Sequence, residues 1–140
     1  MKILVDVNIF EDIYRQRTGW EASLAVVSHV RTGRIDGYVS ALTPPILYFL
    51  RKRTQNEQLA RRSVKWAVAA FKIAAIGEDT LKAAYDSILP DFEDSIQFEC
   101  AKSAGVDRIV TRNKRHFRQP AIVVSTPEEI LDAIEAGNAV

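Results

Sequence analysis

The sequence has a single cysteine, Cys100, only two histidines and no long apolar run. One cysteine cannot form a disulfide within the chain, and it excludes a cysteine-rich zinc site. We interpret Cys100 as a small buried apolar residue and not as a nucleophile. The apolar start at residues 3–5 is cut short by Asp6, so neither a signal peptide nor a membrane span is predicted. We therefore expect a soluble, cytoplasmic protein with no membrane partner.

The sequence also lacks a strong excess of either charge. It has 19 Lys and Arg against 18 Asp and Glu, a formal net charge of +1 that does not by itself indicate a partner. A length of 140 residues with 47% hydrophobic residues suits one domain, residues 1–140, with a substantial core. No internal repeat or low-complexity tract interrupts it.

Short apolar runs alternate with longer segments of helical periodicity. The runs predict strands at Lys2–Asp6, Asp36–Ser40, 73–76, Arg108–Thr111 and 121–124. Helices are expected to start at Asn8, Thr18, Thr43, Asn56, Asp79, Asp91 and Thr126. In the helix from Asn56, Val68 is expected to face inward. This alternation predicts an α/β fold, a three-layer sandwich with a central, mainly parallel sheet.

The stretch from Asp91 to Gly105 is the most informative of these helices. Its first turn holds three carboxylates, from Asp91, Glu93 and Asp94. Asp91 is a good N-cap, and Gly105 can end the helix in the left-handed conformation. Asp91 and Asp94 are three residues apart, so both can face the same space. These acids could simply cap a helix, and residues distant in the sequence are needed to favour a site.

Those residues follow predicted strands. Asp6 ends the first strand, Asn113 lies just beyond the fourth, and the acidic helix starts near the same carboxyl edge of the sheet. Asp6 alone could do no more than bind the N-terminus of the next helix. A carboxylate at the end of a buried strand is costly unless it is paired or metal-bound. Oxygen ligands without cysteine or paired histidines favour Mg²⁺ or Mn²⁺ over zinc.

Four motifs, in this order, carry a family resemblance: ILVDVN at 3–8, SALT at 40–43, DFEDSIQ at 91–97 and IVTRNKRHF at 109–117. They resemble a PIN domain, of the small single-domain type that includes VapC-like toxins, and the likeness extends to residues 126–129. The resemblance implies a metal-dependent endoribonuclease that uses Mg²⁺ or Mn²⁺. It also implies RNA as substrate, a homodimer, and a cognate antitoxin as a possible partner.

The resemblance assigns roles residue by residue. Asp6 and Asp94 match the first and third acids and are the expected metal ligands. Asp91 would be an auxiliary acid in the catalytic group. Asn113 stands where the family commonly has a fourth acid, and its amide can still supply an oxygen. Thr111 matches a hydroxyl close to the site, and Asn8 is expected, with it, to support the site.

One position departs from the family pattern. The second acid usually lies three residues after the threonine that opens the third helix, and here that position holds Ile46. Glu11 and Glu93 are the acids that could compensate. The departure leaves open a catalytically weak or inactive PIN-fold protein that binds RNA or a partner.

A basic run follows the fourth predicted strand, at the edge where the acids are expected. It comprises Arg112, Lys114, Arg115, His116 and Arg118. We expect Arg112, Lys114 and Arg115 to contact RNA phosphates, which makes binding salt-dependent. A second basic group at residues 51–53 is interpreted as a solvated surface. His116 and His29 are interpreted as solvent-facing or structural residues.

Two other α/β folds with a functional aspartate at a strand end are alternative interpretations. A haloacid-dehalogenase-like phosphatase needs a second aspartate two residues after Asp6, where this chain has Asn8. A phosphoreceiver domain needs a phosphoacceptor aspartate at the end of its middle strand, and residues 73–77 offer none. Metal-dependent RNA cleavage is the favoured hypothesis.

Overall fold

The computed structural model describes residues 1–87, 89–117, 119 and 121–137. The strands are β1 (Lys2–Val5), β2 (Asp36–Ser40), β3 (Lys72–Ala74), β4 (Arg108–Val110) and β5 (Val123–Ser125). The helices are α1 (Val7–Arg15), α2 (Trp20–Arg31), α3 (Thr43–Thr54), α4 (Glu57–Ala70), α5 (Glu78–Tyr85), α6 (Phe92–Ala104) and α7 (Pro127–Glu135), with a 3-10 turn, η1 (Lys114–Phe117). None of the described helices combines the length and apolar character needed to cross a membrane.

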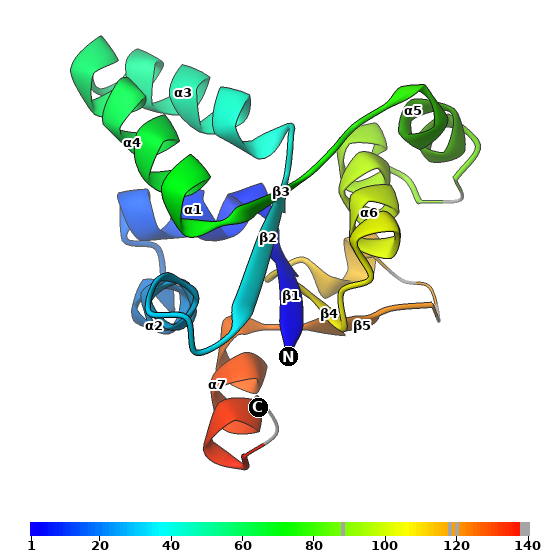
Figure 1. Cartoon of the computed structure of the whole chain (residues 1–140). Coiled ribbons are helices and arrows are strands. Elements are labelled where there is room, and N and C mark those ends of the chain that lie inside the picture. Colours follow the sequence, from blue (N-terminus) through cyan, green and yellow to red (C-terminus); the bar gives the residue numbers. More distant parts are fainter. Residues whose placement is uncertain (88, 118, 120, 138–140) are drawn as a thin grey trace.

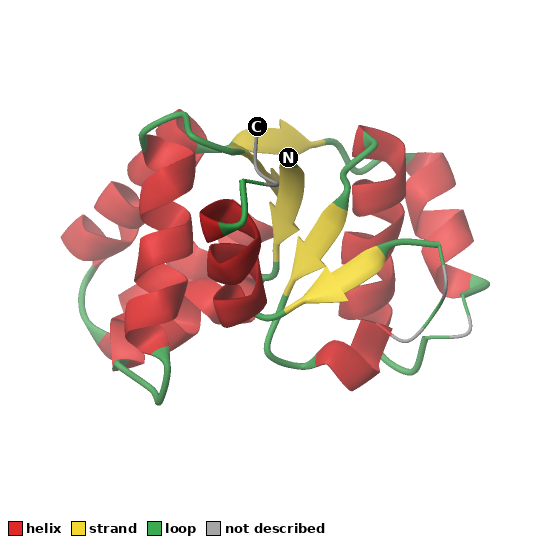
Figure 2. Cartoon of the chain, turned by 90° about the horizontal axis from the view of Figure 1, so that it is seen from below, coloured by secondary structure: helices red, strands yellow, loops and turns green. Residues whose placement is uncertain are grey.

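The five strands form one sheet in the order β3-β2-β1-β4-β5, and every neighbouring pair is parallel (Figures 1 and 2). The predicted α/β fold is therefore confirmed. β1 is the central strand, with Val5 beside Val110 of β4. The backbone N–H of Asp6 continues this ladder by donating to the Val110 carbonyl at 3.0 Å. Asp6 and Thr111 consequently leave the carboxyl edge of the sheet side by side.

Helices cover both faces of the sheet, which gives the expected three layers (Figure 1). Ile3 and Val5 point into an apolar cluster beneath α1, α2, α3, α4 and α7. Leu4 and Ile109 point into a second cluster beneath α5, α6 and η1. Side chains alternate between faces along a strand. Continuing that alternation turns Asp6 and Thr111 towards α6.

The start of α6 and the whole of α7 agree with the sequence prediction. Asp91 is the N-cap of α6, and its Oδ1 accepts the N–H of Asp94 at 3.0 Å. Gly105 ends this helix with a φ of 66°, a conformation that favours glycine. Thr126 and Glu129 form a capping box at the start of α7. Asp91 thus caps the helix, while Glu93 and Asp94 lie in its first turn.

Four predicted helix starts were wrong. Gly77, and not Asp79, is the N-cap of α5. Asp6, and not Asn8, is the N-cap of α1, because β1 ends one residue earlier than expected. Gly19 replaces Thr18 at the start of α2, where its φ of 87° suits glycine. Thr43 is already the first helical residue of α3 and is buried. In each case a neighbouring backbone position takes the cap, so the predicted residue lies one or two positions from it.

The predicted inward face of α4 was also partly wrong. Val68 is 52% exposed, whereas the buried positions are Ala60, Ser63 and Ala67. Ser63 can be buried because its hydroxyl donates to the Leu59 carbonyl at 3.0 Å. These small side chains let α4 pack against α3, so the buried stripe is narrower than hydrophobicity alone predicts.

Candidate active site

Asp6 is almost fully buried, with 1% of its surface exposed. Its Oδ2 accepts the Thr111 hydroxyl at 2.8 Å, and its Oδ1 accepts Nε2 of Gln97 at 3.0 Å. The N–H of Asn8 is a longer donor, at 3.5 Å. Burial raises the pKa of Asp6 although these hydrogen bonds act in the opposite direction. The carboxylate is therefore held in one orientation at a place that disfavours its charge.

Asp94 is the second acid of the site, and it is 7% exposed. Its Oδ2 lies 3.2 Å from Nδ1 of His116. Burial, followed by the charges of Asp6 and Asp91, raises the pKa of Asp94 to about 6, and His116 offsets part of this rise. Burial and the charges of Asp91 and Asp6 also raise the pKa of Glu93. These four acids from two elements therefore act on one another electrostatically.

Thr111 and Asn113 complete this edge of the site. The Thr111 hydroxyl accepts the N–H of Asn113 at 3.0 Å while it donates to Asp6, so one side chain fixes both neighbours. The side chains of Asn8 and Asn113 line a polar pocket with Asp12, Arg17, Thr18 and Arg112. Asn8 contacts Asp6 and Asn113 contacts Thr111 through their backbone N–H groups, and both residues line this neighbouring pocket. Asp91 instead remains exposed at the helix cap.

At the position where the family usually has its second acid, this chain has an apolar side chain that packs on the core. Ile46 is half-buried on α3 and packs against the apolar cluster that contains Val5 and Leu47. Of the two acids considered as substitutes, Glu11 is ion-paired with Arg15 at 3.1 Å and with Arg17 at 3.4 Å. Glu93 is exposed but close enough to feel the charge of Asp6. Within the described residues, Glu93 has no arginine partner, whereas Glu11 has two.

The residues present fit a divalent cation that keeps much of its hydration. Among the described residues, no three His, Cys, Asp or Glu side chains converge closely enough to hold a metal by themselves. Magnesium, however, is usually bound through one or two carboxylates and retains several waters. Asp6 and Asp94 provide two, and each has a raised pKa that a cation would relieve.

The basic run after β4 divides into paired and unpaired residues. Arg112 donates to both Glu128 oxygens, at 3.0 and 2.8 Å, and to the Gly19 carbonyl at 2.6 Å. Lys114 lies 2.9 Å from Glu129. Arg115 is exposed and makes no ion pair within the described part of the chain. Arg118, the last member of the predicted run, lies outside the described residues.

Sequence reasoning missed two residues of the site. Gln97 lies three residues after Asp94 on the same face of α6, and that spacing was the available signal. His116 was interpreted as structural or solvent-facing, yet it contacts Asp94. No local pattern links residues 22 positions apart, and η1 brings His116 back to the start of α6.

A parallel sheet with buried acids at its carboxyl edge, faced by a helix that starts with further acids, defines a PIN-type protein. The sequence model of the PIN domain family matches residues 2–115, and the chain belongs to this family. The chain is 26% identical to ribonuclease VapC1 of Aquifex aeolicus (strain VF5) in an alignment 138 residues long that covers 94% of each chain. This distant homology suggests a nuclease.

Solved structures support the same fold. A toxin–antitoxin complex from Klebsiella pneumoniae is similar with a TM-score of 0.67 and 20% identity, over 89% of this chain and 97% of that one. DNA-bound VapBC from Salmonella typhimurium gives a TM-score of 0.67 and 16% identity, over 91% and 98% of the two chains. At these identities the likeness establishes the fold alone.

Proposed function

We propose that this protein is a metal-dependent endoribonuclease of the VapC type, with Asp6 and Asp94 as the centre of its active site. The carrying observation is that both acids are buried at the carboxyl edge of the sheet with no arginine or lysine against them in the described structure. Stable folds rarely retain such groups without a use. The distant relationship to ribonuclease VapC1 supports RNA as the substrate.

The side chains of the site have separable roles. Mg²⁺ or Mn²⁺, when bound, would polarise the phosphoryl oxygen and make water a nucleophile near neutral pH. Asp6 and Asp94 would hold that cation, with Thr111 fixing the orientation of Asp6. Asn113 would add an amide oxygen, since its backbone N–H contacts the Thr111 hydroxyl that donates to Asp6. The exposed cation of Arg115 would hold an RNA phosphate without reading its sequence.

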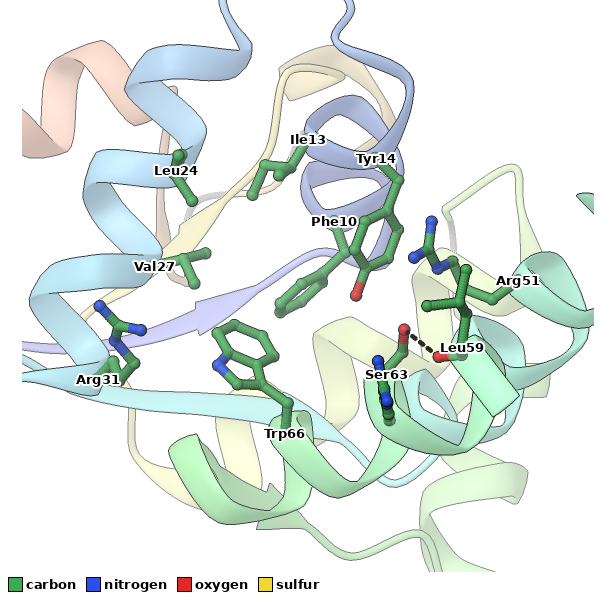
Figure 3. Close-up of a pocket in the computed structure, with 11 residues that line it drawn as sticks. Phe10, Ile13, Tyr14, Leu24, Val27, Arg31, Arg51, Leu59, Ser63 and Trp66 are labelled. Atoms are coloured by element: carbon green, nitrogen blue, oxygen red, sulfur yellow. Dashed lines mark hydrogen bonds between the residues drawn. The ribbon is translucent and has the colours of Figure 1, made fainter. Parts of the chain in front are cut away.

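An antitoxin is the proposed protein partner, and an apolar pocket between α1, α2, α3 and α4 is its proposed contact. Phe10, Leu24 and Trp66 line the pocket, and Figure 3 places Arg31 and Arg51 on opposite sides of it. These arginines face no carboxylate in the described structure, although Arg51 stacks on a tyrosine ring. The pocket therefore suits a segment that carries apolar and acidic side chains. The Klebsiella pneumoniae and Salmonella typhimurium relatives are toxin–antitoxin complexes.

A homodimer and a cytoplasmic location complete the proposal. Phe49 of α3 is 67% exposed and Tyr85 of α5 is 82% exposed, and a dimer interface over either helix would cover one of them. Light scattering of the purified protein tests the dimer directly. A monomer at micromolar concentration would contradict it.

A catalytically weak or inactive PIN protein is the second candidate. The specific observation in its favour is Ile46, which packs on the core where the family commonly supplies an acid. Such a protein would bind RNA or an antitoxin without cleaving. The two candidates differ in one readout, the appearance of cleaved RNA when a divalent cation is added.

The deciding experiment is RNA cleavage by the wild type with Mg²⁺, with Mn²⁺ and with chelator. Asp6→Asn and Asp94→Asn should each reduce the cation-dependent cleavage to background. Asp107→Asn is the matched control, because Asp107 lies at the opposite edge of the sheet, where its carboxylate accepts the Lys2 N–H at 2.8 Å. Full activity in both site variants, with contaminating nuclease excluded, would contradict the assignment. RNA binding without cleavage in the wild type would favour the second candidate.

A further inference from the structure

Gln97 is a buried polar residue for which no role has yet been given. It is 1% exposed, and its amide lies against Asp6 because Nε2 donates to Oδ1 of that carboxylate at 3.0 Å. Its Oε1 is also buried, and within the described residues it has no hydrogen-bond partner. One end of the amide is therefore satisfied and the other is not.

An unpaired amide oxygen in a protein interior is costly. Leaving such a group without a hydrogen bond costs about 1–3 kcal/mol relative to a paired one. Native structures keep few of these atoms, and an unseen water or ion is a common explanation. A leucine at position 97 would fill the interior without this cost. We therefore expect an unseen ligand to contact Oε1 of Gln97, beside Asp6.

The composition of the acidic site indicates what that ligand is. Asp6 and Asp94 supply two carboxylates, and the side chain at position 46 supplies none because Ile46 packs on the core. Amide carbonyl oxygens, like carboxylate oxygens, are ligands of hard divalent cations, but they carry no formal charge. A neutral oxygen would complete the site without adding a third negative charge next to Asp6 and Asp94.

We propose that Oε1 of Gln97 is an oxygen ligand of the divalent cation at Asp6 and Asp94, in place of the acid that position 46 lacks. This inference rests on the proposed cation-dependent function. The same amide has two tasks: Nε2 orients the carboxylate of Asp6, and Oε1 binds the cation that Asp6 holds. Gln97 is thereby a cation-binding residue and not only a support for Asp6.

A purely positioning role is the alternative, and the two differ in which atom of the amide matters. Positioning requires the Nε2 donor, which Gln97→Glu removes and replaces with a negative charge beside Asp6. Cation binding requires the oxygen, which Gln97→Glu keeps and makes anionic. The glutamate variant should therefore bind the cation more tightly in one case and more weakly in the other. Gln97→Leu removes both atoms.

The experiment measures Mn²⁺ affinity by calorimetry, together with melting temperature in chelator and in Mg²⁺. We expect Gln97→Leu to bind Mn²⁺ about tenfold more weakly or worse, in the range seen when residues around a metal are removed. In chelator its melting temperature reports the net of two changes, because the unpaired oxygen is removed together with the Nε2 donor to Asp6. Gln97→Glu should bind Mn²⁺ about tenfold more tightly. Glu99→Gln, which alters the neighbouring Glu99–Lys102 ion pair, is the control and should leave the affinity unchanged.

The possible failures are distinguishable. If Gln97→Leu binds Mn²⁺ as the wild type does, or Gln97→Glu binds it more weakly, Gln97 is not a ligand and this inference is overturned. If the wild type itself binds neither Mn²⁺ nor Mg²⁺, the cation-dependent function fails first. Circular dichroism establishes whether each variant is folded. If one of Gln97→Leu and Gln97→Glu does not fold, the Mn²⁺ affinity of the other still tests the inference.

Discussion

Two groups of carboxylates lie near the same edge of the sheet, and they differ in what faces them. In the first group, Glu128 and Glu129 at the start of α7 face Arg112 and Lys114 at distances of 2.8 and 2.9 Å. These hydrogen bonds to cations hold the pKa of both glutamates below the ordinary value. This group joins α7 to the loop after β4, and it is structural.

Within the described residues, the second group faces no lysine or arginine. Asp6 receives neutral donors from Thr111 and Gln97, and Asp94 faces only His116. Burial raises the pKa of both aspartates, that of Asp94 to about 6. Both groups are carboxylates near the same edge of the sheet, and the residues that face them determine their role. Unmatched buried charge is what marks the candidate active site.

The largest effect on stability is expected from breaking the first group. Arg112→Ala should lower the free energy of unfolding by about 1–3 kcal/mol, because Asp12 and Glu128 lose a partly buried partner. The loss is measured by urea denaturation. A change below measurement error would mean that the Arg112 network contributes only surface ion pairs.

Arg115→Ala is the matched control for that variant, with the same residue change three positions later. Arg115 is exposed and unpaired in the described structure, so its removal should leave stability unchanged. It should lower RNA affinity and reduce the slope of log affinity against log salt by about one counterion. A slope equal to that of the wild type would exclude Arg115 from phosphate contact.

Ile46→Glu tests what happens when a carboxylate without a cationic partner is added at position 46. Ile46 packs against the apolar core, so a glutamate there should cost roughly 1–3 kcal/mol of stability as a buried polar group without a partner. The Mn²⁺ concentration for half-maximal cleavage should not fall. Tighter metal dependence with the melting temperature retained would instead place position 46 in the cation site.

The stability of the metal-free protein should also depend on pH through Asp94 of the second group, and this effect should be smaller than those of the substitutions above. The pKa of Asp94 in the fold, about 6, exceeds its ordinary value of 3.8, so the folded state holds this proton more tightly. The resulting stabilisation is fully present below pH 3.8 and is lost as pH rises through about 6. In chelator, the melting temperature should fall from pH 5 to pH 7, and less so in Asp94→Asn. An equal fall in both proteins would contradict the raised pKa.

Much of the fold and part of the site could be predicted from sequence. Asp6, Asp94 and Thr111 follow from strand ends and one helix start, because parallel strands bring their carboxyl ends to one edge. The partners of the basic run could not be predicted in this way. Arg112 pairs with Glu128, 16 residues later, only because β5 and α7 fold back beside the loop after β4. The contacts of His116 and Gln97 depend likewise on tertiary packing.

Thermal melting with and without Mg²⁺ tests the central claim most directly, in the wild type, Asp94→Asn and Asp12→Asn. The claim predicts that Asp94→Asn melts above the wild type in chelator, since like-charge repulsion is relieved, and gains nothing from Mg²⁺. Asp12→Asn should keep the full Mg²⁺ response, because Asp12 is paired with Arg17 and Arg112 and is not a proposed cation ligand. A full Mg²⁺ response in Asp94→Asn, or its loss in Asp12→Asn, would contradict the assignment of the cation site to Asp6 and Asp94.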